Sequence, residues 1–162
     1  RLTHVNVNYR YTADEVLYIL DNSDAEIVAF GAEFRHVIEK IKPRLGNVRV
    51  FLEVGPGGGG FESFDALCET GTGSPLDIQR KPHDQFFIYT GGTTGMPKGV
   101  MWTHDDMRQI TLAAARLLGP VPETLDALVA TTRTIGPAQA SLIAPPLMHG
   151  TGLLTAMAAM MS

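Results

Sequence analysis

Two stretches near the start of the chain carry apolar side chains at helical spacing. In the first, Thr12 and Glu15 predict a capping box at the start of a helix. One face of this helix would carry the apolar residues Ala13, Val16, Leu17 and Leu20. In the second, the apolar face consists of Phe34, Val37, Ile38 and Ile41. Pro43 is expected to end this helix, because proline lacks the backbone N–H that a helix interior needs. The pattern therefore predicts two amphipathic helices.

Short apolar runs without helical spacing predict strands. They occupy residues 27–30, 48–54, 85–89 and 141–144, and glycine or proline follows most of them closely. Strands that alternate with helices build a parallel sheet with helices packed on its faces. The predicted fold class is therefore α/β, with a mostly parallel sheet and flanking helices.

The glycine run 57–60 follows a predicted strand, but its spacing does not match a dinucleotide fingerprint and no helix begins within it. We interpret it as a plain surface turn before a short helix at residues 64–67. Residues 70–82 are rich in Gly, Ser, Thr and Pro and are expected to form a linker.

A later helix is predicted to begin after Thr103, with negative charge in its first turn. Its expected buried face comprises Met107, Ile110, Ala114 and Leu117. Residues 119–137 contain three prolines and scattered polar residues, so we expect a long surface insertion there.

Composition and charge indicate an ordinary globular chain: 44% of its residues are hydrophobic, 19% are charged, and the net charge is -4. The absence of any Lys/Arg run argues against nucleic-acid binding. Cys68 is the only cysteine, and its helical neighbours predict a buried, inert thiol, which fits a cytoplasmic location. The apolar stretch 153–161 is shorter than the about 20 residues that a membrane span needs.

The stretch from Tyr89 to Gly99 carries the strongest chemical signal. It reads Tyr-Thr-Gly-Gly-Thr-Thr-Gly-Met-Pro-Lys-Gly and follows a predicted strand. Glycines let backbone N–H groups approach an anion, threonine hydroxyls add hydrogen bonds, and Lys98 adds positive charge. Because ligands of α/β sheets usually bind at the carboxyl ends of strands, we predict a phosphate-binding loop at residues 90–99.

This loop differs from the P-loop of kinases and GTPases, in which glycine precedes the lysine, Ser or Thr follows it, and a helix comes next. Here Lys98 stands between Pro97 and Gly99, and the following residues 100–102 are expected to be extended. The sequence therefore does not favour a P-loop phosphotransferase.

Residues 89–99 resemble the hallmark loop of the adenylate-forming (AMP-binding) acyl-CoA synthetases, Tyr-Thr-(Ser/Thr/Gly)-Gly-(Ser/Thr)-Thr-Gly-x-Pro-Lys-Gly. Every position fits, with Gly91 standing where many members carry serine. Residues 5–12 and 144–152 resemble two further stretches of the same family, in the same order. The resemblance covers nearly the whole chain and points to the fatty-acid CoA ligase type.

The resemblance implies an acid-thiol ligase that works in two steps. A carboxylate attacks the α-phosphorus of ATP to give acyl-AMP and pyrophosphate, and coenzyme A then displaces AMP. Fixed donors, Mg²⁺ and a lysine must offset the repulsion between two anionic reactants. Thr90 is expected to help hold the metal, and the residues expected to bind ATP are Thr90, Gly91, Gly92, Thr93, Thr94, Gly95 and Lys98. Ordinary turn hydrogen bonding is the alternative role for the threonines.

The resemblance also places His149 beside the substrate carboxylate and the path of the thiol, as the catalytic candidate. Its position alone is equally compatible with a turn histidine that binds nothing. For His104, the neighbouring capping pattern favours a structural role over ligand contact. Residues 153–161 are expected to pack in a core, with an acyl tunnel lining as the alternative.

Members of the family run to several hundred residues, so we expect residues 1–162 to be a single partial α/β subdomain of the large N-terminal domain. The chain opens on Arg1, and the family's ribose-binding Asp and its mobile C-terminal domain with the catalytic Lys are absent. The parent protein is expected to be an acyl-CoA synthetase and this chain alone to be inactive.

Other functions stay open at this point. One is a non-catalytic interaction module that self-associates through exposed apolar surface. Another is part of a peptide-synthetase adenylation domain or of an aryl-acid CoA ligase. The substrate is expected to be a carboxylic acid, with a fatty acid favoured.

Overall fold

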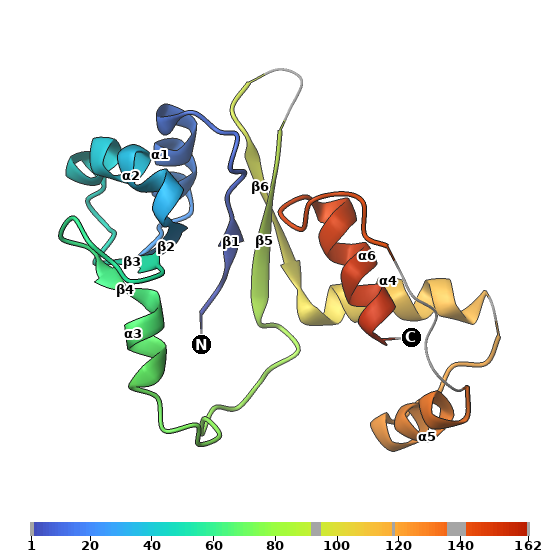
Figure 1. The fold of residues 1–162 in the computed structure, drawn as a ribbon. Coiled ribbons are helices and arrows are strands. Elements are labelled where there is room, and N and C mark those ends of the chain that lie inside the picture. The colour runs from blue at the N-terminus through green and yellow to red at the C-terminus, as the bar shows by residue number, and fades with distance from the viewer. Residues whose placement is uncertain (1, 92–94, 118, 136–141, 162) are drawn as a thin grey trace. The chain divides into compact units, whose positions relative to one another are not determined.

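The computed structural model describes residues 2–91, 95–117, 119–135 and 142–161 (Figure 1). The chain divides into two compact units, which are described separately. The N-terminal unit comprises Val7–Gln79 and Gly91–Lys98, and the C-terminal unit comprises Arg1–Asn6, Arg80–Thr90 and Gly99–Ser162. The assignment of residues 1–162 to a single subdomain stays a prediction.

The N-terminal unit contains a three-stranded sheet in which neighbouring strands are parallel. Its order is β2-β3-β4, with β2 at Ile27–Gly31, β3 at Val50–Val54 and β4 at Glu62–Ser63. Ile27 lies opposite Val50, and Gly31 lies opposite Val54. The predicted strand at 27–30 is therefore confirmed, and the one predicted at 48–54 is confirmed from Val50 onward.

The helices of this unit follow the predicted apolar periodicity. They are α1 (Ala13–Asn22), α2 (Arg35–Ile41) and α3 (Phe64–Glu69), and the short 3₁₀ turns η1 (Ala32–Phe34) and η2 (Lys42–Arg44) flank α2. The capping box is present before α1, since the Glu15 N–H donates to Thr12 Oγ1 at 3.4 Å and the Thr12 N–H donates to Glu15 Oε2 at 2.8 Å.

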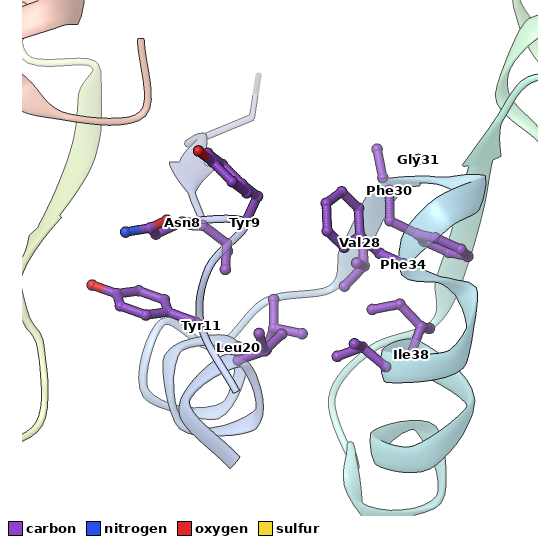
Figure 2. Close-up of a pocket in the computed structure, with 13 residues that line it drawn as sticks. Asn8, Tyr9, Tyr11, Leu20, Val28, Phe30, Gly31, Phe34 and Ile38 are labelled. Atoms are coloured by element: carbon purple, nitrogen blue, oxygen red, sulfur yellow. The ribbon is translucent and has the colours of Figure 1, made fainter. Parts of the chain in front are cut away.

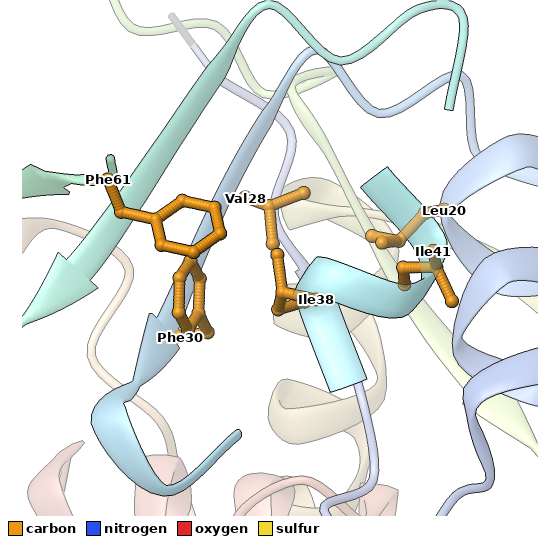
Figure 3. Packing of buried hydrophobic residues seen from close by; sticks show 6 residues of the cluster. All are labelled: Leu20, Val28, Phe30, Ile38, Ile41 and Phe61. Carbon is orange, nitrogen blue, oxygen red and sulfur yellow. The ribbon is translucent and has the colours of Figure 1, made fainter. Parts of the chain in front are cut away.

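A hydrophobic core joins these helices to the sheet (Figure 3). It consists of Leu20, Val28, Phe30, Ile38, Ile41 and Phe61. The rings of Phe30 and Phe61 meet edge to face with centroids 5.0 Å apart, a favourable aromatic geometry. The Lys42 ammonium lies 4.7 Å from the Phe61 ring centroid, so this lysine covers the core with its stem and keeps its charge at the surface.

The C-terminal unit contains a second three-stranded sheet in the order β1-β5-β6. Its strands are β1 (Val5–Asn6), β5 (Gln85–Thr90) and β6 (Lys98–Thr103), and β1 runs parallel to β5 with Val5 opposite Phe87. Three helices follow: α4 (His104–Arg116), α5 (Leu125–Ile135) and α6 (Gly150–Met161). The expected strand 85–89 and the extended residues 100–102 are confirmed.

One predicted element in this unit is wrong, and one helix was not predicted. Residues 142–144 form no strand, and Leu142 is 93% exposed, because a short apolar run has the same pattern whether or not a partner strand is available; Ser141 lies outside the described residues. The expected insertion 119–137 contains α5, which Thr124 caps by accepting the Ala127 N–H at 3.2 Å. Its prolines at 120 and 122 precede the helix and so do not break it.

Two burial predictions are also wrong. Ile110 on α4 is 50% exposed and Leu117, just after the helix, is 87% exposed, whereas Met107 is half-buried; the described part of the chain therefore leaves much of the expected face uncovered. Cys68 is exposed on α3 because the six-residue helix leaves its apolar side chains largely uncovered. Among the described residues, no helix is long and apolar enough to cross a membrane.

Candidate functional site

The predicted phosphate loop lies between two neighbouring strands of one sheet. β5 is the middle strand, and its side chains Phe86, Ile88 and Tyr89 are buried. The chain leaves β5 at Thr90, which is exposed, and enters β6 at Lys98, which is also exposed (Figure 1). Thr90 and Lys98, two polar residues of the motif, thus lie at the ends of two strands that flank the loop.

Within the loop, the described residues fit the demands of an anion-binding turn. Gly95 has φ of 127°, a conformation that residues with a Cβ rarely adopt. Gly91 is exposed, and Pro97 is buried. The predicted ligands Gly92, Thr93 and Thr94 lie outside the described residues, so their roles stay predictions.

Gly99, the last residue of the motif, lies against the ring of Tyr89, its first residue. A Cβ on Gly99 would stand 2.9 Å from Tyr89 Cζ and 3.2 Å from Tyr89 Oη. Real Cβ atoms do not approach a ring carbon so closely, so only glycine allows this approach. Sequence reasoning assigned no role to this pair.

His149 occupies the N-cap position of α6. Its carbonyl accepts the Leu153 N–H at 3.0 Å, and its own N–H donates to the Pro146 carbonyl at 3.0 Å. The side chain is exposed. We expected His149 to follow a strand. In the structure it follows an irregular segment and directly precedes α6.

Two glycines after His149 make close contacts that the sequence did not reveal. A Cβ on Gly150 would lie 3.7 Å from Ile88 Cδ1, so the start of α6 packs on β5. A Cβ on Gly152 would collide with the carbonyl oxygens of Pro145 and Pro146. The fold thereby brings the His149 segment alongside the strand that leads into the phosphate loop.

His104 makes contacts of a structural kind. Its N–H donates to the Asp84 carbonyl at 3.0 Å, and its ring centroid lies 5.8 Å from that of Phe86. The adjacent Thr103 caps α4, since Thr103 Oγ1 accepts the Asp106 N–H at 3.0 Å and donates to Asp106 Oδ2 at 2.7 Å. This hydroxyl is the main cause that lowers the pKa of Asp106. The geometry agrees with the role favoured from the sequence.

Thr90, the predicted metal-binding residue, has no acidic cluster to assist it. In the ranges that the structure describes, no group of three or more His, Cys, Asp or Glu side chains could hold a metal ion. Mg²⁺ commonly binds through substrate phosphates, water and only one or two carboxylates. Among the described residues Thr90 therefore offers a single hydroxyl toward a metal ion, and its role as a metal ligand stays a prediction.

A buried ion pair in the N-terminal unit escaped the sequence analysis. Glu53, at the end of β3, is only 1% exposed and accepts from Arg35 Nε at 2.7 Å and from Nη2 at 2.6 Å. The hydrogen bonds from Arg35 lower the pKa of Glu53 and outweigh the opposite effect of burial. The one signal in the sequence was a carboxylate in an otherwise apolar strand.

The predicted surface turn at residues 57–60 packs against this ion pair. Gly58 and Gly59 have φ of 154° and 59°, and a Cβ on Gly58 would stand 3.0 Å from Arg35 Nη2. The turn thus does more than connect two strands, because it covers the Arg35 guanidinium.

A cavity of about 210 Å³ opens between α1, β2, α2 and residues 7–11 (Figure 2). Its walls are mainly apolar side chains such as Leu20, Phe30 and Phe34, and its polar groups come from Asn8, Tyr9 and Tyr11. None of the predicted ATP-binding residues lines it, and its walls offer no cation. Its chemistry does not suit a polyphosphate.

The α/β fold and the glycine-threonine motif between β5 and β6 agree with the resemblance to adenylate-forming enzymes. Residues 1–162 match the family model described as AMP-binding enzyme. The chain therefore belongs to the AMP-binding enzyme family.

The relatives agree with that assignment. The chain is 31% identical to the medium-chain acyl-CoA ligase Mig of Mycobacterium avium over 98% of this chain and 30% of that protein. It is similar to a putative long-chain-fatty-acid CoA ligase from Rhodopseudomonas palustris, with a TM-score of 0.69 and 25% identity over 96% of this chain and 35% of that one. The anthranilate CoA ligase AuaEII, in complex with anthranoyl-AMP, matches with a TM-score of 0.63 and 27% identity over 68% of this chain and 22% of that one.

The chain spans about 30% of the length of Mig and a smaller or similar share of the other curated relatives. What these relatives bind and convert is therefore a guide to a proposal for the whole protein.

Proposed function

We propose that the protein carrying this chain is an ATP-dependent acyl-CoA synthetase that activates a carboxylic acid as acyl-AMP and transfers the acyl group to coenzyme A. One observation carries the proposal: the complete motif 89–99 joins β5 to β6 in a chain of the AMP-binding family, with Gly95 in the left-handed conformation. The similarity to Mig supports a fatty acid as the substrate.

In this proposal the loop holds the polyphosphate of MgATP. Lys98 contributes positive charge, and Thr90 contributes a hydroxyl to the metal or a phosphate. Backbone N–H groups of Gly91, Gly92, Thr93, Thr94 and Gly95 contribute the donors of an anion-binding turn. Mg²⁺, when bound with ATP, would offset phosphate charge and polarise the α-phosphoryl group.

His149 is proposed to contact the acyl carboxylate or the path of coenzyme A. Support comes from the packing of Gly150 on Ile88, which places the start of α6 beside β5. As a surface side chain at a helix N-cap, His149 is accessible to a substrate. The apolar side chains of α6 are proposed to pack in a core, and an acyl tunnel remains the alternative.

The test is ATP–pyrophosphate exchange with the full-length protein. We expect exchange that depends on a fatty acid such as octanoate, and no exchange by the 162-residue chain alone, because relatives are about three times as long. Failure of the full-length protein with every carboxylic acid tried would refute the proposal, and turnover by the isolated chain would refute the second expectation.

An aryl-acid substrate is the second candidate, and the similarity to an anthranilate CoA ligase favours it over a peptide-synthetase domain. Benzoate and anthranilate in the same exchange assay separate the two substrate classes. A purely non-catalytic interaction module is not favoured, since the reported relatives are CoA ligases. A cytoplasmic location is proposed together with this metabolic role.

A further inference from the structure

The ring of Tyr89 and the backbone of Gly99 touch at the base of the phosphate loop. Tyr89 is 8% exposed and belongs to the middle strand of its sheet. The three atoms nearest to a Cβ built on Gly99 all belong to this ring and its hydroxyl, at 2.9 to 3.2 Å. A larger residue at position 99 would therefore have to displace a buried aromatic ring.

Such a displacement is costly because the ring is confined. A flexible side-chain end can move aside, but a buried ring must find new packing partners in a dense interior. Gly46 has no such neighbour, because a Cβ built on it would meet nothing within 4 Å. The contact thus joins Tyr89 on β5 to Gly99 on β6, close to where the loop begins and ends.

The two charged or hydroxylated residues at the ends of the loop are direct neighbours of this contact. Thr90 follows Tyr89, and Lys98 precedes Gly99. We propose that Tyr89 and Gly99 are positioning residues, whose contact sets the spacing of Lys98 and Thr90 and so adjusts the loop to the polyphosphate of MgATP. This inference rests on the function proposed above.

The ring carries the proposed role, since its Cζ is the atom nearest to a Cβ built on Gly99. Gly99→Ala should move the ring and with it Lys98. Displacements of about 1 Å can lower catalytic efficiency by about 100-fold.

The experiment is steady-state ATP–pyrophosphate exchange by the full-length protein, with KM measured separately for MgATP and for the acid. For Gly99→Ala we expect kcat/KM for MgATP to fall by about 100-fold with KM for the acid unchanged. Tyr89→Leu, which removes the ring and keeps Gly99, should produce a selective loss of the same kind. The double variant should be no slower than the worse single variant, because both changes act through one contact.

Gly46→Ala is the matched control and should retain full activity, since its new methyl group meets open space. Inactivity of the unchanged protein would refute the proposed function itself. Normal kcat/KM for MgATP in Gly99→Ala, or equal rises in both KM values, would refute the positioning role. If Gly99→Ala does not fold, Tyr89→Leu decides: a selective rise in KM for MgATP supports the role, and unchanged kinetics refute it.

Discussion

At the scale of single residues, much of what shapes the site is the absence of a side chain. Gly99 allows the Tyr89 ring to approach, and Gly152 allows α6 to begin directly over the Pro145 and Pro146 carbonyls. The sequence showed these glycines only as parts of motifs. Glycine is needed at these positions because another part of the chain comes very close to the backbone there. A local sequence pattern does not reveal such a contact.

Gly152→Ala tests this view of the His149 segment. The added methyl group would overlap backbone carbonyl oxygens, which cannot rotate away as a side chain can. We expect a loss of about 1–3 kcal/mol in the free energy of unfolding, the usual cost of overpacking. Urea unfolding measures it, with Thr151→Ala, at an exposed neighbouring position, as the control. Equal stability of the two variants would show that the segment has room.

Glu53 predicts a specific acid sensitivity. Its pKa in the folded chain is lowered by hydrogen bonds from Arg35, so the unfolded chain binds a proton more readily than the folded chain. The pair therefore stabilises the fold above the unfolded pKa of about 4.3, and this stabilisation is lost as pH falls through the lower, folded value.

Glu53→Gln should remove that part of the pH dependence. We expect a variant that is less stable at pH 7, with a urea midpoint that falls less between pH 5 and pH 2.5 than that of the unchanged chain, because glutamine has no carboxyl group to protonate. Glu26→Gln is the control, because Glu26 is exposed and only 3.9 Å from Arg49 in a weak surface pair. Parallel pH curves for the unchanged chain and Glu53→Gln would contradict this prediction.

At the scale of helices and strands, elements with strong local signals were predictable. The capping box and periodicity of α1 and α2, and the strands β2, β3 and β5, agree with the sequence. One mistake arose where the outcome depends on partners, since residues 142–144 pair with no strand in the described ranges. The helix α5 was missed because the prolines before it drew attention away from its Thr124 cap. The motif 89–99 was recognisable because it lies in consecutive residues, and its phosphate-binding role stays a prediction.

The cap of α1 gives a quantitative test at this scale. Thr12→Ala removes the oxygen that accepts the Glu15 N–H and also the partner of the Glu15 carboxylate. We expect a loss of about 1 kcal/mol in unfolding free energy, typical of an N-cap threonine. Thermal unfolding of Thr12→Ser, which keeps the hydroxyl, should be close to that of the unchanged chain. A similar loss in both variants would assign the effect to the methyl group.

At the scale of the whole molecule, the α/β class was predictable and the division into two sheets was not. The pairing of Val5 with Phe87 joins residues that lie far apart in the chain, and hydrophobic periodicity does not identify such partners. The same limit hid the exposure of α4, because burial depends on what packs against a helix rather than on its own sequence.

Exposed apolar side chains on α5 predict self-association of the 162-residue chain. Leu125, Leu128 and Val129 lie at helical spacing and are 73%, 39% and 42% exposed. Light scattering should show a molar mass above 17.5 kDa that rises with concentration, and Leu125→Glu with Val129→Glu should lower it. Leu76→Glu, at another exposed leucine, should leave the mass unchanged. A monomer at all concentrations would refute the prediction.

The short strand β1 has a practical consequence for anyone who trims this protein. Val5 and Asn6 occupy the rim of the sheet beside β5. Deleting them would expose the edge of β5, and its unpaired backbone N–H and C=O groups could then pair with a strand of a neighbouring molecule. A version shortened by six residues should therefore form β-rich aggregates, although it would keep every atom of the nucleotide motif.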